Sequence, residues 1–292
     1  MELLLNNLSK KYNSNKFGVS DYSITISSGV LGLLGPNGAG KSTLIKMIST
    51  IIKPTRGEIL LDGINIVKNP NEIRKILGYL PQDFGVYANL NAYEFLTYMA
   101  AMKGIGGNGL KHKIENLLEE VNLIEVAKNN LGTYSGGMIQ RIGIAQALIN
   151  NPKIIIFDEP TVGLDPEERL RFRDLISDLG EDRIVILSSH IVSDIESIAD
   201  EVAIMKKGQL LIKNKQQEII KLVEGKVFEK NIDKTTLDDF KKDNTIVSSF
   251  RLQNNFRVRF ISEHYEKDAI PINPTLEDAY IYLTKREHNV VV

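Results

Sequence analysis

The chain has 292 residues, of which 42% are hydrophobic and 25% are charged, as is ordinary for a globular protein of one large or two modest domains. The lack of cysteine excludes disulfides and thiolate metal sites and fits a reducing cytosol, and the net charge of −1 does not favour nucleic acid as a partner. No run approaches the roughly 20 apolar residues of a membrane-spanning helix, and the N-terminal apolar run is too short for a signal peptide, so any membrane role is expected to come through a partner chain.

Alternating or continuous apolar runs predict the strands of an α/β core that is expected to span residues 1–212. These strands are expected in pieces over about 2–26 and at 30–34, 58–61, 153–157, 184–187 and 201–205. A helix is expected from Lys41 to about Ile51, before the breakers Pro54 and Gly57. Helices between the later strands would give right-handed parallel crossovers.

Two stretches depart from this pattern. Between about 91 and 130 the apolar residues recur at helical spacing, so a helical subdomain is expected at about 85–150. Beyond the core, short strands and helices predict a small C-terminal α/β extension at 213–292, which ends in a helix opened by Pro274 and Thr275. No motif with chemistry occurs in this extension, and we interpret it as a dimer-stabilising or regulatory addition.

A glycine-rich turn between an apolar strand and a helix carries the motif G-x-x-x-x-G-K-[ST]. Its residues are Gly35, Pro36, Asn37, Gly38, Ala39, Gly40, Lys41 and Ser42, and Thr43 follows. Glycines let backbone N–H groups approach a phosphate, and the helix N-terminus adds donors. Lys41 is expected to bridge the β- and γ-phosphates and Ser42 to ligate Mg²⁺, so ATP and Mg²⁺ are the expected cofactors. The alternative is a turn that binds nothing, but such a turn does not require Lys followed by Ser.

The apolar run Ile154–Phe157 ends in two adjacent carboxylates, Asp158 and Glu159. The carboxyl ends of strands are where open α/β sheets bind ligands. Asp158 suits the Mg²⁺ shell, and Glu159 suits the group that orients and deprotonates an attacking water. A solvated pair at the start of a loop is the plainer interpretation, and the nearby phosphate motif argues against it.

Four further segments, together with these motifs and in the same order along the chain, resemble the ABC ATPase family over about residues 2–212. They are Gln82 in YLPQD, similar to the Q-loop; Ser135, Gly136 and Gly137 in YSGGM, similar to the signature sequence; Asp165 in GLD, similar to the D-loop; and His190 after IVILSS, similar to the switch histidine. The resemblance implies a P-loop NTPase core of the ABC type. It also implies that two chains pack head to tail, with each ATP between the phosphate motif of one chain and the signature of the other.

The resemblance assigns roles that the isolated residues do not establish. Gln82 would sense Mg²⁺ and the γ-phosphate, His190 would contact the γ-phosphate, and Tyr12 would stack on adenine. Asp165 is expected both to cap the helix that begins at Pro166 and to line the dimer interface. By itself, Gln82 is an exposed amide, His190 a capping or core histidine, and Tyr12 a packing residue.

The signature departs from the family pattern in two places, since Tyr134 stands for the usual leucine and Met138 for the usual glutamine. The segments YSGGM, EPTVGLDP, IAQAL and NPTLED resemble drug-, antibiotic- and sodium-type exporters with separate membrane subunits. This implies membrane-spanning permease subunits that dock near residues 82–98 and a place at the cytoplasmic face of the cell membrane. A second ATPase subunit is expected as well, as a homodimer, with a heterodimer as the open alternative.

Two alternatives belong to other classes. A soluble ABC-type ATPase in translation or DNA repair would carry two cassettes or long coiled coils, and neither occurs here. No basic patch suggests nucleic acid either. A regulatory nucleotide-binding module with little turnover is disfavoured because Lys41, Asp158, Glu159 and His190 are all present.

Overall fold

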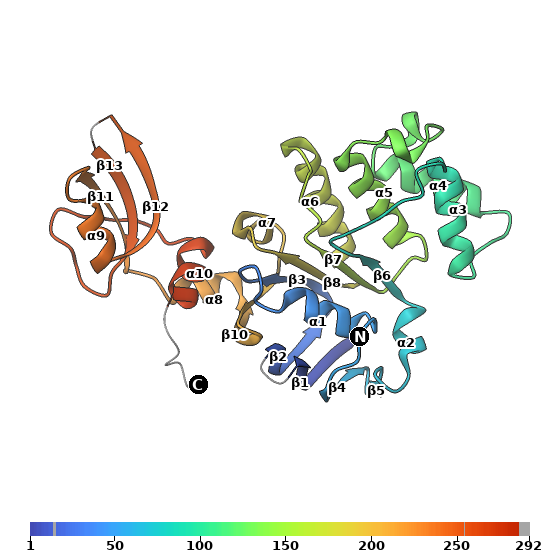
Figure 1. The fold of residues 1–292 in the computed structure, drawn as a ribbon, viewed down its shortest axis with the longest axis horizontal. Helices are drawn as coiled ribbons and strands as arrows, with labels where there is room; N and C mark the ends of the chain where they lie inside the picture. Colours follow the sequence, from blue (N-terminus) through green and yellow to red (C-terminus); the bar gives the residue numbers. More distant parts are fainter. Residues whose placement is uncertain (14–15, 254, 286–292) are drawn as a thin grey trace. The chain divides into compact units, whose positions relative to one another are not determined.

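The computed structural model describes residues 1–13, 16–253 and 255–285, which form two compact units, Met1–Lys213 and Asn214–Val292. The first unit contains two sheets and most of the helices (Figure 1). The second unit is a small α/β element with a core of its own. Each unit is described by itself below.

The main sheet of the first unit has six strands in the order β10-β9-β3-β8-β7-β6. The bounds of these strands are β3 Gly29–Leu34, β6 Leu77–Leu80, β7 Ile154–Asp158, β8 Ile184–Ser189, β9 Glu201–Lys206 and β10 Gln209–Lys215. From β9 to β6 the neighbouring strands pair in parallel. The inner strands β7 and β8 are buried along their whole length, which fits their continuous apolar sequences.

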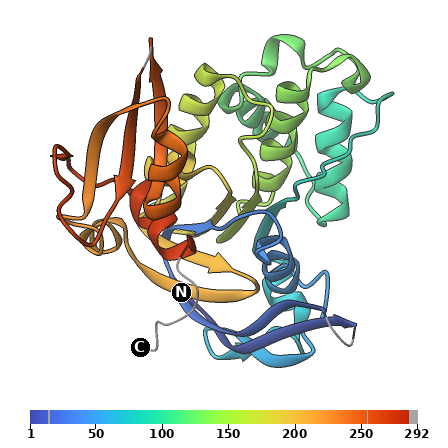
Figure 2. The same ribbon diagram turned by 60° about the vertical axis from the view of Figure 1, so that its left-hand side comes forward.

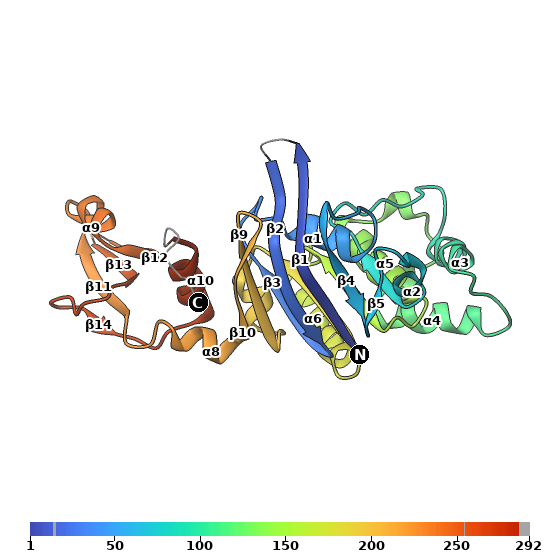
Figure 3. The ribbon, with the colours of Figure 1, turned by 90° about the horizontal axis from the view of Figure 1, so that it is seen from below.

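A second sheet is antiparallel and has the order β2-β1-β4-β5. Its strands are β1 Glu2–Asn13, β2 Lys16–Ser27, β4 Arg56–Leu61 and β5 Ile64–Asn65. Figure 3 shows β1 and β2 running side by side. Helix α1 (Lys41–Ile48) shares one hydrophobic core with residues of both sheets, so the start of this helix is held rigidly at the edge of the main sheet.

The remaining helices of the first unit divide between two places. Helices α6 (Pro166–Gly180) and α7 (Val192–Glu196) contact strands β3 and β8. Helices α3 (Ala92–Met102), α4 (Leu110–Glu120) and α5 (Gly136–Leu148) pack on one another and form a separate group (Figure 2). The short helices are α2 (Pro70–Arg74), η1 (Ile124–Val126) and η2 (Leu131–Thr133).

The second unit builds a four-stranded sheet in the order β12-β13-β11-β14. Its elements are α8 Gln216–Lys221, β11 Val227–Asp233, α9 Leu237–Asp243, β12 Thr245–Leu252, β13 Asn255–Ile261, β14 Ile270–Pro271 and α10 Leu276–Lys285. The core includes Phe228, Val258 and Phe260, with Phe240 packed against it. The charged pair Arg259–Asp278 ties β13 to α10.

The structure differs from the sequence-based expectation in several short elements: β5, β6, β10 and α2 were not predicted, and α1 is shorter than expected. The strand β6 was not predicted, because four residues with Gly78 among them give little alternation. Gly78 packs so closely on α5 that an added Cβ would lie 2.2 Å from the carbonyl oxygen of Ala147. Helix α1 ends at Ile48 rather than Ile51, because Thr50 adopts a φ of 60° that breaks the helical path.

Candidate active site

The phosphate motif forms a tight loop between β3 and α1, which we call the cradle (residues 35–43). Gly40 has a φ of 108°, and an added Cβ there would lie 2.3 Å from the carbonyl oxygen of Gly18 on β2. The backbone N–H of Gly208 donates to the carbonyl oxygen of Ala39 at 2.7 Å. The loop is therefore held by both sheets, and only glycine fits at position 40, directly before the helix.

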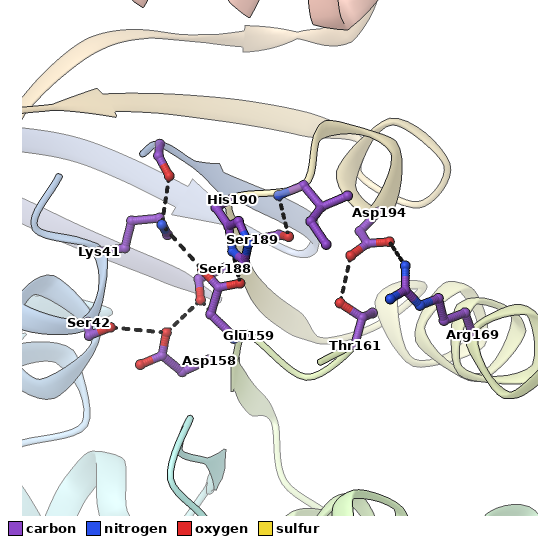
Figure 4. A network of polar contacts seen from close by, with 12 residues as sticks. Lys41, Ser42, Asp158, Glu159, Thr161, Arg169, Ser188, Ser189, His190 and Asp194 are labelled. Atoms are coloured by element: carbon purple, nitrogen blue, oxygen red, sulfur yellow. Dashed lines mark hydrogen bonds and ion pairs between the residues drawn. The ribbon is translucent and has the colours of Figure 1, made fainter. Parts of the chain in front are cut away.

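Lys41 begins helix α1 and is buried although it carries a charge. Its Nζ donates to the carbonyl oxygen of Gly35 at 2.7 Å and lies 3.3 Å from Oε1 of Glu159 (Figure 4). A buried ammonium group needs such partners to offset its lost hydration. The two contacts place this cation at the cradle and beside the carboxylate expected to activate water.

Glu159 follows β7 in an unusual backbone conformation, with a φ of 55°. Its backbone N–H donates to Oγ of Ser188 at 3.0 Å, and its Oε2 lies 2.7 Å from Nδ1 of His190. Glu159 is buried, whereas the side chain of His190 is 41% exposed. Positive φ at a non-glycine residue costs free energy and persists only where the surroundings enforce it. Here the backbone of Glu159 is held by the neighbouring ends of β7 and β8, through its hydrogen bond to Ser188.

Asp158 ends β7 and is almost inaccessible to solvent. Oγ of Ser188 donates to its Oδ1 at 2.6 Å, and Oγ of Ser42 donates to the same atom at 3.4 Å. Burial raises the pKa of Asp158, and the hydrogen bonds from Ser188 and Ser42 oppose this rise. The carboxylate of Asp158 therefore contacts the first turn of helix α1, through Ser42.

Ser42 and Asp158 fit a Mg²⁺ site because both offer oxygen, the donor that Mg²⁺ prefers. No group of three or more His, Asp or Glu side chains able to hold a metal is found in the part of the chain that the structure describes. Mg²⁺ is commonly bound by one or two protein oxygens together with substrate phosphates, and this sparse donor set agrees with that pattern.

A cavity of about 720 Å³ opens over the cradle, which is within the size range of small-molecule sites. The predicted residues that line it are Tyr12, Asn37, Gly38, Ala39, Gly40, Lys41, Ser42, Thr43, Gln82 and Glu159. The hydroxyl of Tyr12 lies 3.2 Å from Oγ1 of Thr43, which keeps the exposed ring at the cavity edge. Gln82 lies in the loop after β6 and lines the same cavity.

Four of the predicted residues lie elsewhere, at the N-termini of α5 and α6. Ser135 caps α5 by accepting from the N–H of Met138 at 3.2 Å, and Asp165 caps α6 as expected, by accepting from the N–H of Glu168 at 2.9 Å. A Cβ added to Gly137 would lie 3.2 Å from the carbonyl oxygen of Gly163. Ser135, Gly136, Gly137 and Asp165 are not among the residues that line the cavity over the cradle.

Sequence reasoning missed Ser188 and Phe17. Ser188 contacts both acidic residues, and its signal was the pair of serines that ends the strand before His190. Phe17 lines the cavity beside Tyr12 on the neighbouring strand, and Nζ of Lys11 lies 5.4 Å from its ring centre. No pattern in the sequence marks Phe17, because its place depends on the pairing of β1 with β2.

The cradle, the buried lysine and the acidic strand end define a P-loop nucleotide hydrolase. The family model described as ABC transporter matches residues 19–162. The YxlF protein of Bacillus subtilis (strain 168), an uncharacterized ABC transporter ATP-binding protein, is 38% identical over 224 residues, which cover 77% of this chain and 74% of that protein. The chain therefore belongs to the ATP-binding proteins of ABC transporters.

Two other comparisons agree. The bacitracin transport ATP-binding protein BcrA of Bacillus licheniformis is 43% identical over 70% of this chain and 66% of its own length. The dimeric post-hydrolysis structure of the ATP-binding cassette MJ0796, bound to ADP and Pi, superimposes with a TM-score of 0.68 at 27% identity, covering 73% of this chain and 98% of that one. The chain spans only 24% of ABC transporter A family member 1 of Dictyostelium discoideum, at 36% identity.

These findings confirm the expected P-loop NTPase fold of the ABC type, with ATP binding and ATP hydrolysis as its activity. They favour a transporter cassette over a soluble ABC-type ATPase of translation or DNA repair. Among the residues that the structure describes, no helix is both long enough and apolar enough to cross a membrane.

Proposed function

We propose that this chain is the nucleotide-binding subunit of an exporter, and that two copies enclose two ATP molecules head to tail. The observation that carries the proposal is the division of the predicted residues into two groups. One group lies at the cavity over the cradle: most of its members line the cavity, and Asp158 and His190 contact the lining residues Ser42 and Glu159. We call it the cradle group (Tyr12, Asn37, Gly38, Ala39, Gly40, Lys41, Ser42, Thr43, Gln82, Asp158, Glu159 and His190). The other group, Ser135, Gly136, Gly137 and Asp165, lies at two helix N-termini outside this cavity. A second copy would bring its signature residues to the cradle of the first, which gives a two-fold symmetric pair.

The cradle group divides the work of hydrolysis in this proposal. Backbone N–H groups of the cradle and Lys41 hold the β- and γ-phosphates, while Ser42 and Asp158, with Gln82, hold Mg²⁺. Mg²⁺ would neutralise charge that develops on the phosphate oxygens. Tyr12 stacks on the base.

The acid–base chemistry falls to Glu159 and His190. Glu159, 2.7 Å from His190, orients the attacking water and accepts its proton. With the imidazole of His190 protonated at both nitrogens, Nδ1 donates to Glu159 and Nε2 can donate to the γ-phosphate. Lys41, 3.3 Å from Glu159, supplies positive charge on the other side of the carboxylate.

Export is supported by the names of the relatives, since BcrA serves bacitracin transport. We infer separate membrane-spanning permease subunits as partners, docking near residues 82–98, and a location at the cytoplasmic face of the cell membrane. This stretch includes Tyr87 and Tyr98, exposed aromatic rings whose centres lie 5.6 Å apart. Exposed aromatic rings of this kind are enriched in protein interfaces.

The variant Glu159→Gln tests the arrangement of two chains. The amide keeps the shape of the side chain but cannot accept a proton, so ATP binding is retained while hydrolysis falls by about 100-fold or more. Size-exclusion chromatography with light scattering should then show a dimer at millimolar ATP and a monomer with ADP. A variant that binds ATP but stays monomeric would refute the head-to-tail arrangement, and a wild-type chain that does not hydrolyse ATP would refute the proposal altogether.

A further inference from the structure

A second network of polar contacts lies beside the candidate active site, and the roles assigned so far do not use it. Oγ1 of Thr161 donates to Oδ2 of Asp194 at 2.6 Å, and Nη1 of Arg169 lies 3.7 Å from Oδ1 of the same carboxylate (Figure 4). Thr161 is 3% exposed and Asp194 is 8% exposed. A carboxylate buried to this degree requires partners, and both of its oxygens have one.

The three side chains come from the segments on which hydrolysis depends. Thr161 follows Glu159 by two residues, in the loop 159–165 that ends at the helix cap Asp165. Asp194 lies in the first turn of α7, four residues after His190. Asp194 therefore joins the segment of the catalytic glutamate to the segment of the switch histidine, at a point away from their direct contact.

Arg169 extends the network to the start of α6. Its Nε donates to the carbonyl oxygen of Leu164 at 3.3 Å, and the N–H of Leu164 donates to the carbonyl oxygen of Thr161 at 3.2 Å. The loop 159–165 is thus fixed at its middle by Asp194 and at its end by Arg169 and the cap at Asp165. Its first residue, Glu159, holds a strained backbone conformation that needs such support.

We propose that Asp194 is a positioning residue for ATP hydrolysis, which acts through Thr161 and Arg169 to hold the loop 159–165 in register with His190. This inference rests on the proposed roles of Glu159 and His190. The carboxylate touches neither the cradle nor the cavity over it. Loss of the network displaces the water-activating carboxylate by a fraction of an ångström, and such displacements slow an oriented reaction strongly while leaving phosphate binding in place.

Substitution of Thr161 gives the most specific test, because its hydroxyl donates the hydrogen bond to Asp194. Thr161→Val removes the donor at nearly constant volume, and Thr161→Ser keeps it. We expect Thr161→Val to lower kcat by about tenfold with KM for ATP within about twofold of the wild type, and Thr161→Ser to keep most of the activity. Asp194→Asn, which retains an acceptor oxygen but loses the charge toward Arg169, should lower kcat less than Asp194→Ala does.

A matched control is available on α6. Arg171 forms an exposed ion pair with Glu167 at 2.7 Å, and this pair is separate from the contacts of Asp194 with Thr161 and Arg169. Arg171→Met should leave kcat and KM at wild-type values. Melting temperatures and titrations with a fluorescent ATP analogue on every variant separate a loss of folded protein from a loss of turnover.

The double variant Thr161→Val/Asp194→Ala decides between a shared contact and two separate effects. If the two residues act through one hydrogen bond, the double variant loses no more activity than the worse single variant. A wild-type kcat in both single variants, multiplied losses in the double variant, or a rise in KM at constant kcat would each overturn the inference. Absence of ATPase activity in the wild type would instead refute the proposed function.

Discussion

Ser188 holds the two acidic residues at the end of β7, and its replacement by alanine tests how their charge is controlled. Its hydroxyl, which is fully buried, donates to Asp158 at 2.6 Å and accepts from the N–H of Glu159 at 3.0 Å. A hydrogen bond to a charged acceptor contributes about 1.5–3 kcal/mol. If that whole contribution is expressed in the transition state, Ser188→Ala lowers kcat/KM by about 10- to 150-fold.

The same substitution should change the pH dependence. Burial raises the pKa of Asp158, and hydrogen bonds from Ser188 and Ser42 lower it. The hydrogen bond from Ser188 has the larger of these two effects. Without it the pKa of Asp158 rises further, so the protonated form, which is a poor metal ligand, persists to higher pH. Activity that depends on the carboxylate is present above this pKa and lost below it. The acid limb of the ATPase profile should therefore move to higher pH, and more Mg²⁺ should be needed for half-maximal rate.

Ser49 provides the control, because it is also a buried serine but its hydroxyl donates to a neutral acceptor, the carbonyl oxygen of Ile45, at 2.9 Å. Ser49→Ala should cost about 1 kcal/mol of stability and leave the pH profile unchanged. The assay is steady-state ATPase rate against pH and Mg²⁺ concentration for the three proteins. An acid limb that stays at the wild-type position in Ser188→Ala, with kcat/KM within twofold, would refute the reasoning.

Two further substitutions test the cradle and the C-terminal unit. Gly40→Ala places a methyl group 2.3 Å from the carbonyl oxygen of Gly18, at a φ of 108°, so ATP affinity should fall at least about tenfold in a fluorescence titration; unchanged affinity would contradict the assigned role of this turn. Asp278→Ala leaves Arg259 without the carboxylate that its Nε and Nη2 contact, at a cost of about 3 kcal/mol. Calorimetry should show earlier melting of residues 214–285 while ATPase activity persists, and one unchanged transition would count against that reasoning.

The cradle and the acidic strand end could be predicted because each is a short segment whose chemistry is written in consecutive residues. Lys41 follows the glycine turn directly, and Asp158 and Glu159 follow an unbroken apolar strand. Their meeting in space needed only one further assumption, that the carboxyl ends of parallel strands share an edge of the sheet. The contact between Lys41 and Glu159 agrees with that assumption.

The contacts that escaped prediction depend on the alignment of strands far apart in the sequence. Ser188 reaches Asp158 because β7 and β8 pair in parallel with these two residues as partners, and nothing local sets that register. Thr161 and Asp194 are 33 residues apart and meet only after α6 and β8 have packed. The antiparallel sheet of β1, β2, β4 and β5 was likewise visible only as separate strand pieces.

Helix α1 differs from α5 and α6 in how it begins. Ser135 and Asp165 cap α5 and α6 with their side chains, whereas the residue before α1 is Gly40, which provides no side-chain cap. The first N–H groups of α1 are therefore open to an anion, and a bound anion would stabilise the fold by mass action, by about 2.7 kcal/mol at a concentration 100 times its Kd. The melting temperature of the unlabelled protein should therefore rise when a nucleotide binds. ATP analogues and inhibitors can then be screened by thermal shift.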